Sequence, residues 1–164
     1  MSANSNKQPV AIVTGASSAM GLGIARALLE RRYRVVANSR TISKSKDLKP
    51  SADLVLVDGD IGKKETAARA ADAAVRHFER IDLLVNNAGI YIPKPFTEYT
   101  AEDFEAMIST NIAGYFYVTQ LAVVQMRKQK SVIIRVSIAS EVGSFGSRSL
   151  RFSESGTRLV TPDP

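Results

Sequence analysis

Short apolar runs alternate along the chain with longer stretches in which apolar residues recur at helical spacing. Residues 9–14, 33–39, 52–58, 81–89 and 131–137 are rich in Val, Ile and Leu, which is typical of buried strands. Each of the first four runs gives way to polar or glycine-containing sequence before the next element begins. The pattern therefore predicts five strands, all short and largely buried.

The stretches between these runs predict helices over residues 20–32 and 63–80, and a longer helical region over 100–111 and 112–128. In the alanine-rich second helix, one apolar stripe comprises Ala67, Ala70, Ala71, Ala74, Val75 and Phe78. The order β-α-β-β-α-β-α-β predicts an α/β fold, a Rossmann-like doubly wound parallel sheet with helices on both faces and right-handed crossovers.

Composition narrows the class of protein. The chain has 164 residues, enough for one domain, with 45% hydrophobic and 23% charged residues. It has no cysteine and one histidine, His77, so we expect no metal site. No apolar run reaches the length of a membrane span, and the polar N-terminus does not resemble a signal peptide, so we expect a cytoplasmic protein without a membrane partner.

The positive charge is concentrated in one segment. Residues 26–49 contain eight basic and two acidic residues. The net charge of this segment is therefore +6, the same as the net charge of the whole chain. The basic residues are Arg26, Arg31, Arg32, Arg34, Arg40, Lys44, Lys46 and Lys49. A solvated basic face and an anion-binding site both explain this segment. Nucleic acid is not an expected partner, because no aromatic residues are interleaved with the charge.

A glycine-containing turn joins the first strand to the first helix, in the stretch TGASSAMGLGIARAL from Thr14 to Leu28. In nucleotide-binding turns one glycine permits the sharp bend, another lets the backbone approach the pyrophosphate, and a third lets the helix pack on the sheet. Gly15 and Gly21 occupy the outer positions and Ala19 the middle one. An alternative register uses Gly15, Gly21 and Gly23 with a longer loop.

This stretch resembles the TGxxxGxG cofactor loop of the short-chain dehydrogenase/reductase family. Without a gap, the family positions fall on Thr14, Gly15, Gly21, Ile24, Ala25 and Leu28. The resemblance implies that Gly15, Ser17, Ser18, Met20 and Gly21 bind the cofactor. Ala19 departs from the pattern. A positive φ there would cost on the order of 1 kcal/mol, whereas a negative φ would leave a methyl group crowding the cofactor, and both weaken binding.

Two further motifs support the resemblance. The sequence NNAG ends the fourth strand, and the family likeness implies that Asn87 steadies the sheet while Ala88 and Gly89 lie beside the cofactor's ribose. Taken alone, NNAG also fits an ordinary turn. Asp60 and Ile61 follow the third strand, where the family uses such a pair to contact the adenine. The alternative for Asp60 is a turn-forming or helix-capping role.

The end of the second strand bears on cofactor choice. Proteins that bind NAD generally place an acidic residue there, which holds the ribose hydroxyls. This chain instead reads Asn38, Ser39, Arg40, and no acid occurs between Arg31 and Lys46. Because a guanidinium pairs well with a phosphate, Arg40 favours NADP(H) over NAD(H).

The catalytic part of the resemblance is incomplete. Asn111 matches the family's helix asparagine, which kinks the helix and supports a proton relay, although an ordinary polar residue at a helix junction fits the same position. The family's YxxxK pair, a tyrosine acid and the lysine that lowers its pKa, is not found in the sequence. The family's catalytic serine aligns with Ile138, so Ser140 could serve only after a shift in register.

The resemblance covers residues 8–140, so we expect an NADP(H)-binding domain over 1–140 and an irregular tail over 141–164. The implied strand order is 3-2-1-4-5, without the last family strands, as in a truncated member. Three functions stay open: an oxidoreductase acting on a small carbonyl or alcohol, a non-catalytic dinucleotide-binding module, and a fragment that associates with other chains. In the family the helix equivalent to 112–128 packs against its twin, which implies a homo-oligomer.

Overall fold

The computed structural model describes residues 8–130 and contains a four-stranded parallel sheet. The strands are β1 (Val10–Thr14), β2 (Arg34–Ser39), β3 (Leu54–Asp58) and β4 (Leu83–Val85). Their spatial order is β3-β2-β1-β4, which confirms the first four positions of the predicted order and the Rossmann-like fold class. The predicted fifth strand, residues 131–137, lies outside the described residues.

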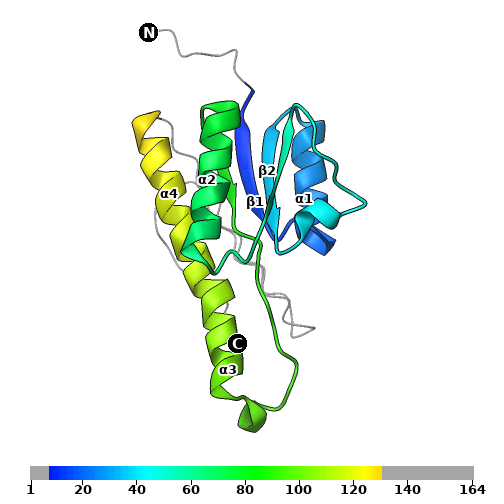
Figure 1. Ribbon diagram of the computed structural model, residues 1–164, viewed down its shortest axis with the longest axis vertical. Coiled ribbons are helices and arrows are strands. Elements are labelled where there is room, and N and C mark those ends of the chain that lie inside the picture. The colour runs from blue at the N-terminus through cyan, green and yellow to red at the C-terminus, as the bar shows by residue number, and fades with distance from the viewer. Residues whose placement is uncertain (1–7, 131–164) are drawn as a thin grey trace, which may run out of the picture.

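Helices cover both faces of this sheet (Figure 1). The long ones are α1 (Ala19–Glu30), α2 (Lys64–Phe78) and α4 (Tyr115–Lys128). Shorter ones are α3 (Ala101–Met107), a π-helical turn η3 (Ile108–Gly114), and the 3-10 turns η1 (Ile42–Lys44) and η2 (Phe96–Glu98). Within residues 8–130 no helix is long and apolar enough to cross a membrane.

Two apolar cores result from the alternation of side chains along the strands. On one face, Ile12 and Val36 pack with residues of α2 and α4. On the other, Val13 and Val35 pack with Ala25 of α1. Strands that are buried on both faces explain why the sequence shows continuous apolar runs instead of an alternating pattern.

The stripe predicted for the second helix is wrong at one position. Five of its members are buried, but Val75 is 36% exposed. Val75 follows Ala74 directly, and one residue turns a helix by about 100°, so Val75 lies at the border of the apolar face instead of within it.

The helical region after β4 begins with a capping box at Thr100. The Thr100 hydroxyl accepts a hydrogen bond from the Asp103 N–H, and the Asp103 carboxylate accepts one from the Thr100 N–H, which completes a capping box. Lys94 also pairs with the Asp103 carboxylate. The hydrogen bond from Lys94 is the main reason why the pKa of Asp103 lies below its ordinary value. The start of α3 is therefore fixed to the loop that precedes it.

Candidate functional site

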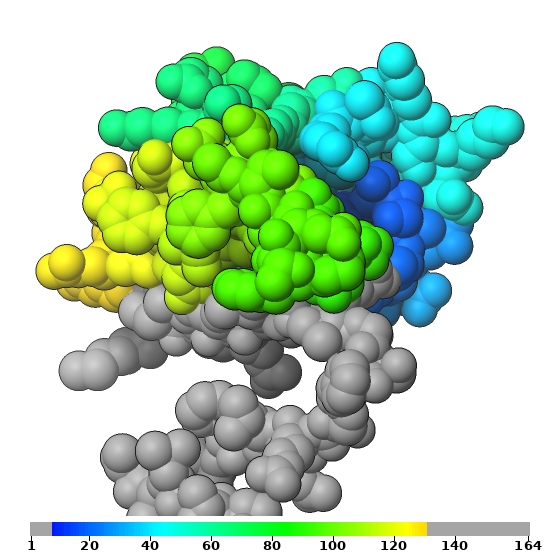
Figure 2. Space-filling view, turned by 90° about the horizontal axis from the view of Figure 1, so that it is seen from below, coloured from blue at the N-terminus to red at the C-terminus, as the bar shows by residue number. Residues whose placement is uncertain are grey.

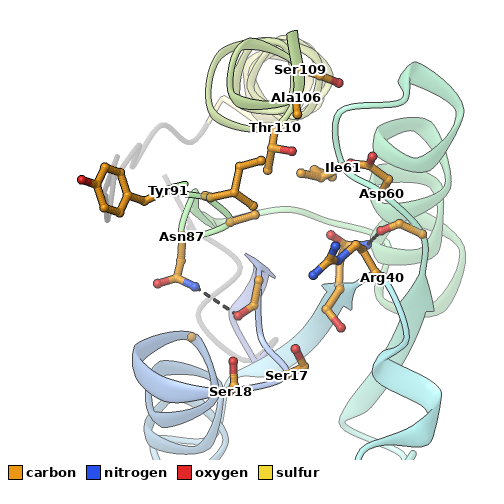
Figure 3. A pocket seen from close by; sticks show the side chains of 18 of the residues that line it. Ser17, Ser18, Arg40, Asp60, Ile61, Asn87, Tyr91, Ala106, Ser109 and Thr110 are labelled. Atoms are coloured by element: carbon orange, nitrogen blue, oxygen red, sulfur yellow. Dashed lines mark hydrogen bonds between the residues drawn. The ribbon is translucent and has the colours of Figure 1, made fainter. Parts of the chain in front are cut away.

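A pocket of about 910 Å³ lies at the carboxyl edge of the parallel sheet, where ligands bind in open α/β folds. The segments that follow all four strands contribute to it, together with α3 and η3. Figure 2 faces this end of the molecule, where the blue glycine turn, the cyan segment after β2 and the green α3 region approach one another. Figure 3 shows how labelled side chains from these segments surround the same space.

All the residues predicted to bind a cofactor line this pocket. They are Gly15, Ser17, Ser18, Met20, Gly21, Arg40, Asp60, Ile61, Asn87, Ala88 and Gly89. They come from four segments spread over 75 residues of sequence, and the sheet alone brings them together. The structure thus supports the grouping, while the binding role of each residue stays a prediction.

The glycine turn is packed against the turn after β4. Gly15 has a φ of 66°, a conformation that favours glycine. A Cβ on Gly21 would overlap the Gly15 carbonyl oxygen and the Asn87 side-chain amide. These two glycines are therefore required by the backbone bend and by the close approach of α1 to the sheet.

The geometry decides between the two registers considered for this turn. Ala19 has a φ of 45°, so it occupies the left-handed region in which glycine is normally found. Gly23 has open space on its Cβ side, with no atom within 4 Å. Ala19 therefore stands at a true glycine position, and the ungapped register is the one that fits.

A network of hydrogen bonds joins the end of β1 to the turn after β4, at the base of the pocket. The Thr14 hydroxyl oxygen accepts from the backbone N–H groups of Asn87 and Ala88, both at 3.0 Å. The Asn87 side-chain amide donates to the carbonyl oxygens of Thr14 and Gly15, both at 3.1 Å. The Asn87 side chain thus joins the ends of β1 and β4 and steadies the sheet, as the resemblance implies.

The ends of β2 and β3 form the opposite wall. The Asn38 amide donates to the carbonyl oxygens of Val57 and Gly59 at 2.9 and 3.1 Å, which holds the two strand ends together. Asp60 accepts a hydrogen bond from the Gly62 N–H at 2.9 Å, so it forms the turn that we considered as its alternative role. Asp60 nevertheless lines the pocket and lies beside Ile61 in Figure 3.

The basic segment does not form one continuous anion site. Arg26 pairs with Asp47 at 2.8 Å, and Arg34, at the amino end of β2, lies 3.6 Å from Asp53 and over the Phe78 ring. Of the eight basic residues only Arg40 lines the pocket. The clustering in the sequence therefore overstated the anion site, because closeness in the sequence does not decide which side chains face the pocket.

Asn111 lies on η3, away from the main pocket. Its side-chain oxygen accepts from the Ile90 N–H at 2.8 Å, and its side-chain nitrogen donates to the Ile90 carbonyl at 2.9 Å. Both polar ends of the side chain are thus used to hold the segment after β4. Ser140 lies outside the described residues.

The pocket has further lining residues that the sequence analysis did not identify. They are Thr41, Gly59, Lys63, Ile90, Tyr91, Pro93, Glu102, Glu105, Ala106, Ser109 and Thr110, in addition to Ala19, Asn38 and Ser39 at positions already discussed. Several follow a strand directly, so their position after a strand end was an available signal. The residues of α3 and η3 had none, since helical periodicity does not show which face meets a distant loop. Among residues 8–130 no cluster of metal-ligating side chains occurs.

Fold, pocket and glycine turn define a Rossmann-like α/β domain, and comparison with known proteins identifies its family. A family profile described as short chain dehydrogenase matches residues 9–151. The chain belongs to this short-chain dehydrogenase/reductase family. The profile match ends beyond residue 140, and the domain boundary that we expected there stays a prediction.

Individual relatives agree with this assignment. The chain is 31% identical over 147 residues to the hydroxynaphthalene reductase-like protein Arp2 of Metarhizium robertsii, covering 86% of this chain and 55% of that protein. It is 35% identical over 128 residues to the putative oxidoreductase YtkK of Bacillus subtilis, covering 73% and 50%. The chain therefore spans about half the length of the curated relatives it matches.

Solved structures give the same result. A 3-ketoacyl-(acyl-carrier-protein) reductase from Brucella melitensis, complexed with NADH, aligns with a TM-score of 0.72 and 26% identity over 79% of this chain and 57% of that chain. A short-chain dehydrogenase from Streptomyces avermitilis aligns with a TM-score of 0.73 and 27% identity over 80% and 49%.

Proposed function

We propose that this chain binds NADP(H) in the pocket at the carboxyl edge of its sheet. In this proposal it forms the dinucleotide-binding part of an oxidoreductase that interconverts a small carbonyl compound and its alcohol. The observation that carries the proposal is the convergence of all predicted cofactor residues on one pocket. The names of the relatives, which are reductases and dehydrogenases, support the reaction class.

The pocket has the features that a dinucleotide requires. Ser18 caps α1 without a side-chain hydrogen bond, so the first N–H groups of this helix are available to a pyrophosphate. Gly15 and Gly21 keep the backbone close at the same place. Ser39, at the other wall, has a buried hydroxyl without a hydrogen-bond partner in the described part of the chain. The site therefore fits the group.

The choice of NADP(H) over NAD(H) rests on Arg40. This residue is exposed at the pocket wall and makes no hydrogen bond or ion pair within residues 8–130. A free guanidinium can bind a 2′-phosphate through two parallel hydrogen bonds, whereas a ribose hydroxyl offers no charge to it. Lys63, which also lines the pocket, adds positive charge to the site.

The bound cofactor would supply or accept the hydride, and the residues of this chain would bind and orient it. Because Ile90 uses both polar ends of the Asn111 side chain, we assign this side chain a positioning role. A contribution of Asn111 to a proton relay stays a prediction. The identity of the carbonyl or alcohol substrate, the cytoplasmic location and the lack of a nucleic-acid partner stay predictions.

A titration of both cofactors tests the proposal. NADPH and NADH are added to the purified chain, and binding is followed by nicotinamide fluorescence and by calorimetry. We expect saturable binding of one dinucleotide per chain, with NADPH bound more tightly. No saturable binding of either cofactor would overturn the proposed function, and equal affinity would overturn the assignment of Arg40.

We also propose self-association through the helical region that contains residues 112–128. Ile108, Ile112 and Phe116 follow one another at intervals of four residues and are 42–55% exposed, so they form an apolar row. Val118, on the same helix, is instead fully buried in the chain's own core and takes no part in this row. Sedimentation velocity tests the proposal, since Phe116→Glu should convert a dimer to a monomer.

A further inference from the structure

The turn that carries Arg40 is held at both ends by residues at the end of the neighbouring strand, Asp58 and Gly59. Asp58, the last residue of β3, lies opposite Ser39 in the parallel register of β2 and β3. Its carboxylate accepts a hydrogen bond from the Ser43 N–H at 2.8 Å and a second, short one from the Ser43 hydroxyl. Ser43 is thereby bonded to Asp58, and Ser39 is bonded to the next residue, Gly59, with Arg40 between the two serines.

Other contacts make this closed turn rigid. Ile42, beside Ser43, is completely buried in the core beneath α1. The Gly59 N–H donates to the Ser39 carbonyl at 3.0 Å, which continues the strand pairing up to the turn. The backbone carbonyl of Asp58 accepts in turn from the Arg69 guanidinium at 2.7 Å. The backbone around Arg40 is therefore fixed, although its side chain is free.

Asp58 and Ser43 take no direct part in the pocket. Ser39, Arg40 and Thr41 line it, but neither Asp58 nor Ser43 does. The two hydrogen bonds from Ser43 also hold the pKa of the Asp58 carboxyl below its ordinary value, so the carboxylate is ionised at neutral pH. A negative charge this close to an anion site needs an explanation, because by itself it repels a phosphate.

We propose that Asp58 is a positioning residue for cofactor selectivity, which holds the Ser39–Ser43 turn so that Arg40 meets the 2′-phosphate of NADP(H). The inference rests on the proposed function and deepens it. The gain is the preorganisation of the turn, because a residue held in place before binding loses less freedom when the ligand arrives. The closed turn offsets the repulsion that the carboxylate exerts.

The negative charge of Asp58 weakens NADPH binding, whereas its positioning of the turn strengthens it. Because the two effects have opposite signs, a substitution of Asp58 tests the proposal. If its charge dominates, Asp58→Ala tightens NADPH binding. If positioning dominates, the same variant weakens NADPH binding and leaves NADH nearly unchanged, since NADH has no phosphate for Arg40. Ser43→Ala removes one of the two hydrogen bonds without changing the charge. Asp58→Asn removes the charge, and its side-chain oxygen can still accept from the Ser43 N–H while its NH2 group donates to the Ser43 hydroxyl.

The experiment measures dissociation constants of NADPH and NADH for the full chain and these variants, and their ratio is the readout. We expect the preference for NADPH to fall on the order of fivefold in Asp58→Ala and about two- to threefold in Ser43→Ala. It should be retained or increased in Asp58→Asn. Asp53→Ala is the matched control, because it removes a carboxylate that pairs with Arg34 at the far end of the same strands.

The outcomes separate this inference from the proposed function. An unchanged or increased preference in Asp58→Ala overturns the positioning role while leaving NADP(H) binding intact, and so does an equal loss in Asp53→Ala. A wild-type chain that binds both cofactors equally overturns the role of Arg40 and the positioning role together. Thermal melts of each variant, compared with Asp53→Ala, show whether a loss of preference merely follows a loss of folding.

Discussion

Three substitutions in the glycine turn should change stability in different directions, because the three positions have different backbone and space requirements. Ala19 has a φ of 45°, which costs an L-residue about 1–2 kcal/mol. Glycine removes this strain but makes the unfolded chain more flexible, which costs about 0.4–1 kcal/mol. The difference gives Ala19→Gly a net stabilisation of about 0–1.6 kcal/mol, and we expect tighter binding of the dinucleotide.

The other two positions serve as opposing controls. In Gly21→Ala, the added methyl group overlaps the Gly15 carbonyl oxygen and the Asn87 amide, so we expect a loss of about 1–3 kcal/mol and weaker binding. In Gly23→Ala, the methyl group enters open space on the helix, so the better helix former should stabilise the chain by up to about 1 kcal/mol without affecting binding.

Urea unfolding and NADPH titration of the three variants provide the assay. For a chain of this length, 1 kcal/mol corresponds to about 2–4 °C in melting temperature, which scanning calorimetry resolves. The reasoning is refuted if Gly23→Ala weakens binding while Ala19→Gly changes nothing. That result would make Gly23 the working glycine, as in the alternative register.

Three further predictions concern charge and chemistry. Arg40→Asp should weaken NADPH binding by about 1.5 kcal/mol, the low end for a charged hydrogen bond because the site is exposed, and spare NADH; equal losses in both titrations would contradict this. The lowered pKa of Asp103 stabilises the fold at neutral pH, and this contribution is lost as the pH falls through that pKa. Asp103→Asn should therefore make the melting temperature fall less steeply between pH 7 and pH 3, which thermal melts over this range would show. The 164-residue polypeptide should bind NADPH without oxidising it in the presence of ketones, since none of its tyrosines has a lysine four residues later; turnover abolished by Tyr115→Phe would disprove this.

The fold could be predicted from the sequence because each strand is a separate apolar run and each helix has its own period. The same logic found the glycine turn and NNAG, which are local patterns. It could not fix the sign of φ at Ala19, since alanine can adopt either, and the structure alone shows the positive value.

The sequence also could not predict which residues far apart in the chain come together at the pocket. Eight basic residues cluster between positions 26 and 49 in the sequence, but only Arg40 among them lines the pocket. Glu105 and Thr110 line it from a helix whose facing is set by packing against a distant loop. The pairing of Asp58 with Ser43 spans 15 residues and two elements, and no motif in the sequence marks it.

The hydroxyl of Thr14 sets the order in which this pocket can form. It joins groups that are 73 and 74 residues apart in the chain, so the wall formed by Asn87 and Ala88 is absent until β4 has been synthesised and has docked beside β1. Contacts of such separation form slowly, because a long loop must close first. Cofactor binding therefore requires that folding is complete. A cofactor present during synthesis would stabilise the chains in which β1 and β4 have already paired.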